Sequence, residues 1–331
     1  MTLNGKPKFA MYWAAGCGGC EIAVLNIHEK ILEVDANFEV VFWPVAMDAK
    51  YKDVEAMKDG EIFLTLFNGG IRNAENEHLA RLLRQKSQVL VAFGSCAIEG
   101  CIPGLANLSS PEQIFEAVYR SPSTVNEDGR VPQYLTQVPE GELHIPIFYP
   151  MLKTLQDVVD VDYFIPGCPP ESHQIAAVID AVLAALSGKA ELPPTGAFLG
   201  VGDSTVCDEC PRQRNVKHIK QFVRIQEVEH IDPDLCLLEQ GILCSGPATA
   251  SGCQGKCPIA GAPCVGCYGP AVGALDQGAR LMTALASVID SKDPAEIDRI
   301  LDGIVDPAGT FYRFGLARSM LRTARVAGNG R

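Results

Sequence analysis

The sequence predicts an α/β protein: a doubly wound parallel sheet of the flavodoxin type, followed by an irregular cysteine-rich domain with C-terminal helices. Two observations support this prediction. Strand-like and helix-like segments alternate through the first half of the chain, which is typical of parallel sheets with helices on both faces. From residue 202 to residue 270, glycine, proline and cysteine replace any regular hydrophobic period, and this indicates a second kind of structure.

Five segments are predicted to be strands because they are short, rich in Val, Ile and Phe, and apolar on both faces, as in a buried parallel sheet. They are Lys8–Trp13, Phe38–Val45, Ile62–Phe67, Gln88–Phe93 and Val161–Ile165. Helices are predicted at Glu21–Val34, Ala74–Gln85, Pro111–Tyr119, Met151–Val159 and Glu171–Leu186. The segment Pro103–Pro150 interrupts this alternation and is polar in its middle, so we expect a surface excursion without chemistry.

The composition changes near "SGKAELPPTGAFLG", where Gly and Pro indicate a boundary. We therefore predict a flavodoxin-like domain over residues 1–187 and a cysteine-rich domain over residues 188–331. Helices are expected near Ala271–Ser291 and Pro294–Leu301, and the tail "GTFYRFGLARSMLRTARVA" is either an amphipathic docking helix or a terminal cap. The irregular segment cannot form a core from apolar side chains alone and needs another source of stability. Bound metal can stabilise its fold.

Charge and hydropathy exclude several function classes. The 331 residues carry a net charge of −12, which argues against nucleic acid as the main partner because phosphates attract a basic surface. The first residues do not resemble a secretory signal, and no apolar run is long enough for a membrane span. We therefore expect a cytoplasmic protein, in which cysteines bind metal or do redox chemistry more often than they form disulfides.

Four of the thirteen cysteines follow predicted strands. Cys17 and Cys20 follow the first strand, Cys96 follows the fourth and Cys168 follows the last. Because the carboxyl ends of parallel strands lie at one edge of a sheet, these thiols should converge, and four thiolates are the ligand set of a 4Fe–4S cluster. A redox CxxC pair leaves Cys96 and Cys168 unexplained, "GCGGCE" is not a dinucleotide-binding GxGxxG, and structural zinc prefers local pairs of ligands.

Eight further cysteines crowd into 61 positions: Cys207, Cys210, Cys236, Cys244, Cys253, Cys257, Cys264 and Cys267. Three sets of four would use twelve of the thirteen cysteines. Three clusters in one chain would form a path for electrons. Three structural zinc sites, which have no redox chemistry, and a disulfide scaffold, against which the odd cysteine count argues, are the alternatives. Cys101 is left over, either as a competing ligand five residues after Cys96 or as a small buried apolar side chain.

The chain resembles the small, electron-transferring subunit of NiFe hydrogenases over nearly its whole length. The resemblance rests on CxGC after the first strand, "GSCA", "GCPP" and the cysteine-rich segment. The tail "DPAGTFYRFGLARSMLR" is similar to the cytoplasmic, methyl-viologen-reducing subunits that are associated with heterodisulfide reductase.

The resemblance implies three 4Fe–4S clusters. The proximal set is Cys17, Cys20, Cys96 and Cys168; the distal set is Cys207, Cys210, Cys236 and Cys244; the medial set is Cys253, Cys257, Cys264 and Cys267. Periplasmic relatives have a histidine where this chain has Cys207, and a proline at one medial ligand position that Cys257 fills here, so we expect a 4Fe–4S medial cluster of lower potential. His218 or His230 is an alternative distal ligand. Glu21, next to a ligand, either moves protons or is a carboxylate favoured by the helix dipole.

The resemblance also implies the function. The subunit takes electrons from a NiFe centre in a separate large subunit and passes them through a small 2Fe–2S subunit to a flavin-containing heterodisulfide reductase. Two CxxC motifs near the two chain ends, as a nickel site requires, are not found in this chain, so catalytic residues are expected in the partner. A quinone-reductase-type subunit and a zinc scaffold are the alternatives; the first usually lacks the eight later cysteines.

Overall fold

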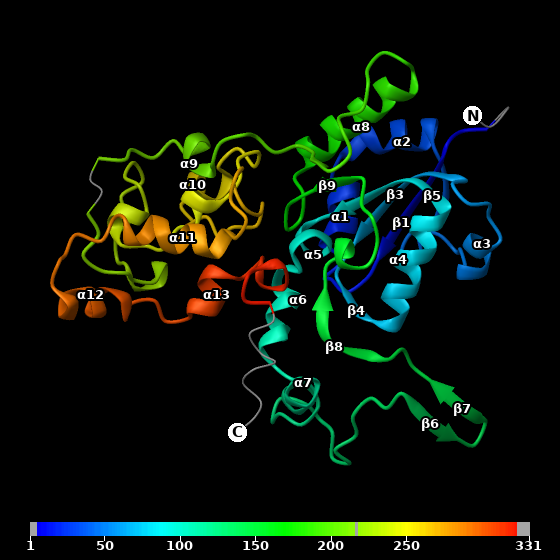
Figure 1. Ribbon diagram of the computed structural model, residues 1–331, viewed down its shortest axis with the longest axis horizontal. Coiled ribbons are helices and arrows are strands. Elements are labelled where there is room, and N and C mark those ends of the chain that lie inside the picture. The colour runs from blue at the N-terminus through cyan, green and yellow to red at the C-terminus, as the bar shows by residue number, and fades with distance from the viewer. Residues whose placement is uncertain (1–4, 216–217, 323–331) are drawn as a thin grey trace.

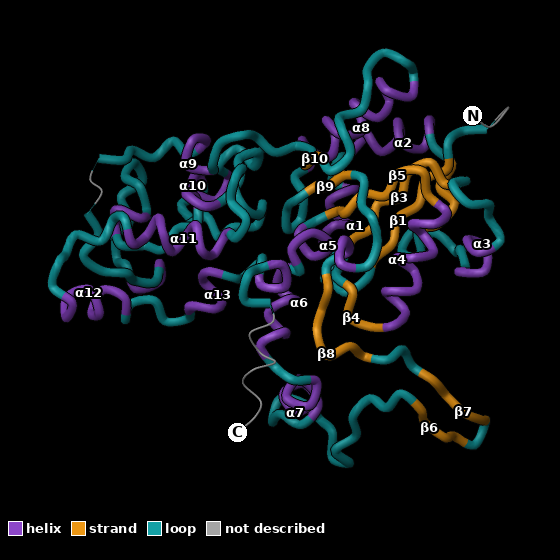
Figure 2. Tube along the Cα trace, viewed as in Figure 1, coloured by secondary structure: helices purple, strands orange, loops and turns teal. Residues whose placement is uncertain are grey.

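A computed structural model describes residues 5–215 and 218–322. Its centre is a six-stranded sheet in the order β10-β9-β5-β3-β1-β2 (Figures 1 and 2). The strands are β1 (Lys8–Trp13), β2 (Glu39–Phe42), β3 (Ile62–Asn68), β5 (Ser87–Phe93), β9 (Tyr163–Ile165) and β10 (Ala197–Phe198). All neighbouring pairs are parallel. The predicted flavodoxin-type sheet is therefore confirmed, with β10 as an additional edge strand.

Helices cover both faces of the sheet. One face packs against α1 (Gly19–Leu25), α2 (Ile31–Asn37) and α8 (Ser172–Leu186) through an apolar core that includes Met11, Val24, Phe93 and Ile175. The other face packs against α3 (Tyr51–Glu55), α4 (Ala74–Lys86) and α5 (Ser95–Glu99), with Phe42, Phe67 and Leu83 completely buried. Burying strands on both faces explains why their sequences are apolar throughout.

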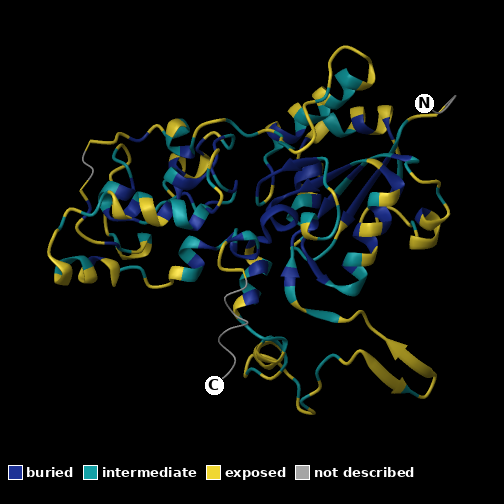
Figure 3. Ribbon diagram, viewed as in Figure 1, coloured by how far each residue is buried: buried dark blue, intermediate teal, exposed yellow. Residues whose placement is uncertain are grey.

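The excursion after α5 projects from this body (Figures 1 and 3). It contains α6 (Cys101–Gly104), η2 (Leu105–Leu108), α7 (Pro111–Tyr119) and a hairpin of β6 (Leu135–Val138) and β7 (Gly141–His144). It returns as β8 (Phe148–Lys153), which pairs antiparallel with β4 (Ile71–Asn73). The predicted helix α7 is confirmed.

The helix predicted at Met151–Val159 is wrong. The backbone of Leu152 is held on both sides by the Asn107 side chain, which accepts from its N–H at 2.8 Å and donates to its carbonyl at 3.0 Å. These bonds and the pairing with β4 favour an extended strand, and Thr154 with Asp157 then begins only a 3-10 turn, η3 (Leu155–Asp157). An apolar run of this length does not distinguish a strand from a helix.

Two other predicted helices are shorter in the structure. The segment Glu21–Val34 breaks after α1, where His28 takes a φ of 55° before η1 (His28–Lys30) and α2. The segment Ala271–Ser291 is helical only over α11 (Gln277–Ala286), because the Asp276 side chain caps the N–H of Ala279 and so sets the start of the helix.

The second half is mostly loops. Its helices are α9 (Val206–Glu209), α10 (Lys256–Ile259), α11, α12 (Pro294–Leu301) and α13 (Pro307–Phe311), with 3-10 turns η4 (Ile225–Glu227), η5 (Leu238–Gln240), η6 (Gly246–Ala248) and η7 (Leu316–Arg318). Helix α12 matches its prediction. The apolar core here is small and centred on Phe222, Leu281 and Ile300. The domain division at residue 187 stays a prediction.

A buried arginine ties its own segment to a second loop and to helix α10. The Arg212 guanidinium donates to the carbonyls of Pro258, Asp232 and Leu235 at 3.0, 2.7 and 3.0 Å. The C-terminal tail forms α13 and η7 rather than one amphipathic helix, and its last residues, 323–331, lie outside the described residues. Within residues 5–215 and 218–322, no helix is long and apolar enough to cross a membrane.

Candidate iron–sulfur sites

The proximal set lies at the carboxyl edge of the sheet, as predicted. Cys17 follows β1, Cys20 lies in the first turn of α1, Cys96 lies in α5 after β5, and Cys168 follows β9. All four line one open cavity. The loops are fixed to one another because the N–H groups of Gly94 and Ser95 donate to the carbonyls of Ile165 and Gly167, each at 2.8 Å.

Glycines leave room for the sulfur atoms in this cavity. A β-carbon at Gly94 would lie 2.4 Å from the Sγ of Cys20, and one at Gly19 would lie 3.3 Å from the Sγ of Cys17. Gly18 has a φ of +81° and takes the left-handed conformation that begins α1. Four thiols around a cavity that larger residues would fill are a donor set that fits a 4Fe–4S cluster.

Cys101 belongs to this neighbourhood too. It is 1% exposed, and its Sγ lies 3.6 Å from that of Cys168. Its N–H donates to the carbonyl of Phe314 at 2.8 Å, and the Phe314 ring packs against Cys96 and Cys101. The edge of the sheet therefore holds five thiols, and the C-terminal tail packs on two of them, Cys96 and Cys101.

Glu21 is buried rather than exposed at the start of its helix. Its carboxylate accepts hydrogen bonds from the Nε1 of Trp43 and from the Nδ2 of Asn68, the latter at 2.8 Å. Burial raises the pKa of this carboxyl, while the two hydrogen bonds act in the opposite direction. The contacts tie α1 to β3 and to the segment after β2, which gives Glu21 a structural role.

The distal set also lines one open cavity. Cys207 lies in α9, Cys210 follows that helix, and Cys236 and Cys244 flank η5. A β-carbon at Gly246 would lie 3.0 Å from the Sγ of Cys207. Burial raises the pKa of Cys207 to about 12, so a bound metal has to displace the thiol proton. This donor set also fits a cluster.

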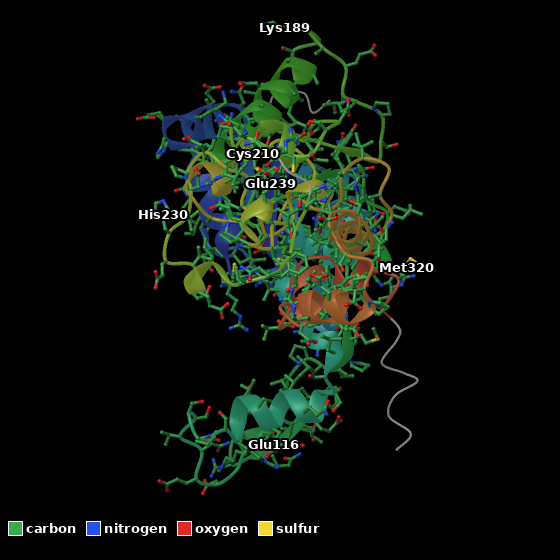
Figure 4. All side chains as sticks on the ribbon, turned by 90° about the vertical axis from the view of Figure 1, so that its left-hand side faces the viewer. Glu116, Lys189, Cys210, His230, Glu239 and Met320 are labelled. Carbon is green, nitrogen blue, oxygen red and sulfur yellow. The ribbon has the colours of Figure 1, made fainter. Side chains whose placement is uncertain are left out.

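Neither histidine proposed as an alternative distal ligand lines this cavity. His218 is exposed and faces Asp290, with its Nδ1 at 3.4 Å from the carboxylate. His230 is exposed and projects at the periphery, whereas Cys210 lies inside the outline of the molecule (Figure 4).

The medial thiols are neighbours in space. Burial raises the pKa of Cys267 to about 12, and the charges of Cys257 and Cys253 add to the effect. Cys264 is buried and interacts with Cys267. Cys257 lies in α10 and is exposed.

The three sets adjoin one another in a fixed order. At one end, Cys168 of the proximal set and Cys267 pack against the same buried cluster of Cys96, Cys101 and Phe314. At the other end, the backbone N–H of Cys264 donates to the Sγ of the distal Cys244 at 3.3 Å. In the described ranges, no three His, Cys, Asp or Glu side chains converge as the ligands of a single metal ion would.

Comparison with known proteins identifies the chain. Residues 17–182 match the family described as NADH ubiquinone oxidoreductase, 20 Kd subunit, and this match alone does not separate hydrogenases from quinone-linked enzymes. An F420-non-reducing hydrogenase iron-sulfur subunit of Archaeoglobus profundus is 39% identical over 95% of this chain and 97% of its own. The chain belongs to the family of these hydrogenase iron-sulfur subunits. It is therefore the electron-transfer subunit of a hydrogenase, an oxidoreductase.

Other members of this hydrogenase family agree. The corresponding F420-non-reducing hydrogenase subunit of Methanothermobacter thermautotrophicus is 38% identical over 96% of each chain. The corresponding vhu hydrogenase subunit of Methanocaldococcus jannaschii is 40% identical over 85% of this chain and 88% of its own. These matches extend across the cysteine-rich half, which the 20 Kd subunit family does not cover.

Solved structures confirm the fold. The NiFeSe hydrogenase of Dm. baculatum aligns with a TM-score of 0.51 and 18% identity over 87% of this chain and 100% of its own. The NiFeSe hydrogenase of Desulfovibrio vulgaris Hildenborough aligns with a TM-score of 0.52 and 17% identity over 82% of this chain and 95% of its own. At such identities the similarity shows the fold alone.

Proposed function

We propose that this subunit relays electrons from dihydrogen oxidation at a NiFe centre in a separate large subunit, through three 4Fe–4S clusters, to an iron–sulfur or flavin partner. The clusters, when bound, supply one-electron transfer. The chain supplies the twelve thiolates: Cys17, Cys20, Cys96 and Cys168 for the proximal cluster, Cys253, Cys257, Cys264 and Cys267 for the medial one, and Cys207, Cys210, Cys236 and Cys244 for the distal one.

One observation carries the proposal: the thiol sets adjoin end to end. Cys168 and Cys267 pack against the same buried cluster, and the backbone N–H of Cys264 donates to the Sγ of Cys244 at 3.3 Å. A scaffold of three zinc ions has no need for contiguous sites, because each ion only staples its own loops. The spread of the thiols also favours clusters over single ions, since each cysteine of a 4Fe–4S cube binds a different iron.

The two ends of this path suggest the partners. The proximal cavity opens at the edge of the sheet, where we propose that the large subunit binds. At the distal end, Arg214 lines the cavity of Cys207, and the exposed Lys220 and Arg224 follow it in a stretch, residues 211–224, that has no acidic residue. We propose that an acidic acceptor docks here: a small 2Fe–2S subunit that serves a heterodisulfide reductase in the cytoplasm. Because the relatives are named F420-non-reducing, F420 is not the proposed acceptor.

The first test is to purify the complex anaerobically and to count its metals. We expect about twelve irons and about twelve labile sulfides assignable to this subunit, with nickel only when the large subunit copurifies. Cys96→Ser, Cys210→Ser and Cys267→Ser should each alter one of three separate electron paramagnetic resonance signals. Iron near four with zinc in the remaining sites would leave only the proximal cluster and would refute the relay.

The acceptor is tested separately. Hydrogen-dependent reduction of methyl viologen without reduction of F420 is expected, and crosslinking should join the distal end to the acceptor subunit. Reduction of F420 by the complex at a comparable rate would contradict this part of the proposal.

A further inference from the structure

A buried carboxylate lies between the proximal and medial sets. Glu99 is the last residue of α5, three residues after Cys96, and is only 5% exposed. Its Oε1 lies against Gly269, two residues after Cys267: a β-carbon at Gly269 would be 3.7 Å away. The same helix reaches the medial set through Ser95, whose Oγ donates to the carbonyl of Cys267 at 2.5 Å. Glu99 therefore occupies the junction of the two sets.

The counter-charge comes from the C-terminal tail. The Nη1 of Arg318 in η7 lies 3.3 Å from the Oε1 of Glu99. The side-chain oxygen of Gln156, in the amide orientation that satisfies its neighbours, accepts from the Nε of Arg318 at 2.8 Å. Ala317 packs closely on Gly100, which lies between α5 and α6: a β-carbon at Gly100 would lie 2.4 Å from the β-carbon of Ala317. The tail is thus fixed with its arginine over Glu99.

We propose that Glu99 couples proton uptake to electron transfer. It takes up a proton when an electron reaches the neighbouring proximal or medial cluster, and Arg318 sets the pH range in which this uptake occurs. This inference rests on the proposed function, because it needs both clusters.

Electrostatics gives the direction of the effect. Burial raises the pKa of Glu99 to about 7, and the charge of Asp276 at the start of α11 adds to this, while Arg318 acts in the opposite direction. Among the described residues, Arg318 from the C-terminal tail and Asp276 from the start of α11 act on Glu99 through their charge. An added electron is one more negative charge nearby, and like charges favour the protonated carboxyl. Glu99 is therefore poised to change its charge near neutral pH.

The step balances. One electron arrives along the path, one proton leaves solvent, and one O–H bond forms on the Glu99 carboxylate, so the net charge of the junction is unchanged. Arg318 is 34% exposed along its side chain, which brings the pair within reach of water. Because the proton is bound only after reduction at high pH, and in both states at low pH, the midpoint potential should fall with rising pH only above about pH 7.

The test is potentiometric titration of the intact hydrogenase, followed by electron paramagnetic resonance from pH 5 to pH 9. In the wild type, the proximal or the medial potential should fall above about pH 7 with a slope approaching about 59 mV per tenfold change in proton concentration. Glu99→Gln, which keeps the shape and an oxygen acceptor for Arg318, should abolish this slope. Arg318→Gln should move its onset to higher pH, because the pKa of Glu99 rises further when its counter-charge is lost.

The matched control is Glu77→Gln. Glu77 is a partly buried carboxylate on α4 that is paired with Arg81 and Lys153, and neighbouring positive charge lowers its pKa to about 2. The Glu77→Gln substitution should leave the proximal and medial potentials and their pH dependence unchanged. A slope that persists in Glu99→Gln, or no slope in the wild type at either cluster, overturns the inference. Failure of the proposed function looks different, because signals or iron would then be missing from the wild type.

Discussion

The Sγ of Cys20 lies where a side chain on Gly94 would begin: a β-carbon built there would be 2.4 Å from the sulfur. Gly94 follows β5 and precedes Cys96, so the segments that follow β1 and β5, which β3 separates in the sheet, meet at this point. The proximal site therefore depends on the absence of a side chain at Gly94 as well as on its four thiols. Gly94 also has a φ of +85°, which other residues adopt at a cost.

Gly94→Ala should therefore displace Cys20 and remove the proximal cluster. We expect the iron of the subunit to fall from about twelve to about eight, with the distal signal unchanged. The measurement is iron content together with electron paramagnetic resonance of the purified complex. Gly60→Ala is the control, because Gly60 has a φ of +69° but its added β-carbon would lie 3.8 Å from Gln88 and near no thiol. Full iron in Gly94→Ala would contradict the account of this site.

Cys101 supplies a second prediction, because its Sγ is 3.6 Å from that of Cys168. If Cys101 is a neighbour and not a ligand, Cys101→Ala should retain all the iron and shift only the proximal signal. Cys168→Ala should lose about four irons. Iron analysis of the two variants side by side decides between the assignments. Loss of iron in Cys101→Ala would make Cys101 a ligand of the proximal cluster.

The sequence predicts the sheet and its carboxyl-edge thiols well because both depend on local pattern. The apolar runs at β1, β3 and β5 have no polar face, and each is followed by a turn with a cysteine or glycine. The segment Met151–Val159 is predicted wrongly because its conformation depends on bonds from Asn107, 45 residues away in the chain. Tertiary contacts of this kind leave no periodic signal.

The site shows the same limit. The spacing of the cysteines could predict three sets, but not that Cys101 lies against Cys168 or that Phe314 covers both Cys96 and Cys101. Glu99 and Arg318 are 219 residues apart, so neither can be singled out before the tail is seen folded on α5. The one available signal is the position of Glu99 between two cysteines.

Arg214 should raise the potential of the distal cluster. It lines the cavity of Cys207, and its charge acts on that thiol. A positive charge favours the reduced, more negative cluster, so Arg214→Gln should lower the distal potential by about 40 mV, which corresponds to about 1 kcal/mol for a charge pair near the surface. Potentiometry at low ionic strength measures the shift. Arg299→Gln is the control, because Arg299 on α12 is exposed and does not line this cavity. An equal shift in both variants would show a general charge effect.

Removing iron should unfold the two halves unequally. The flavodoxin-like half has two apolar cores on either side of its sheet, whereas the second half has one small core and many loops. We expect anaerobic chelation of the complex to lower the hydrogen-exchange protection of amides in 206–270 by about a hundredfold or more, about 2.7 kcal/mol. Amides of β3 and β5 should stay protected, because side-chain packing holds them without metal. Equal loss in both halves would mean that the clusters stabilise the whole chain as one cooperative unit.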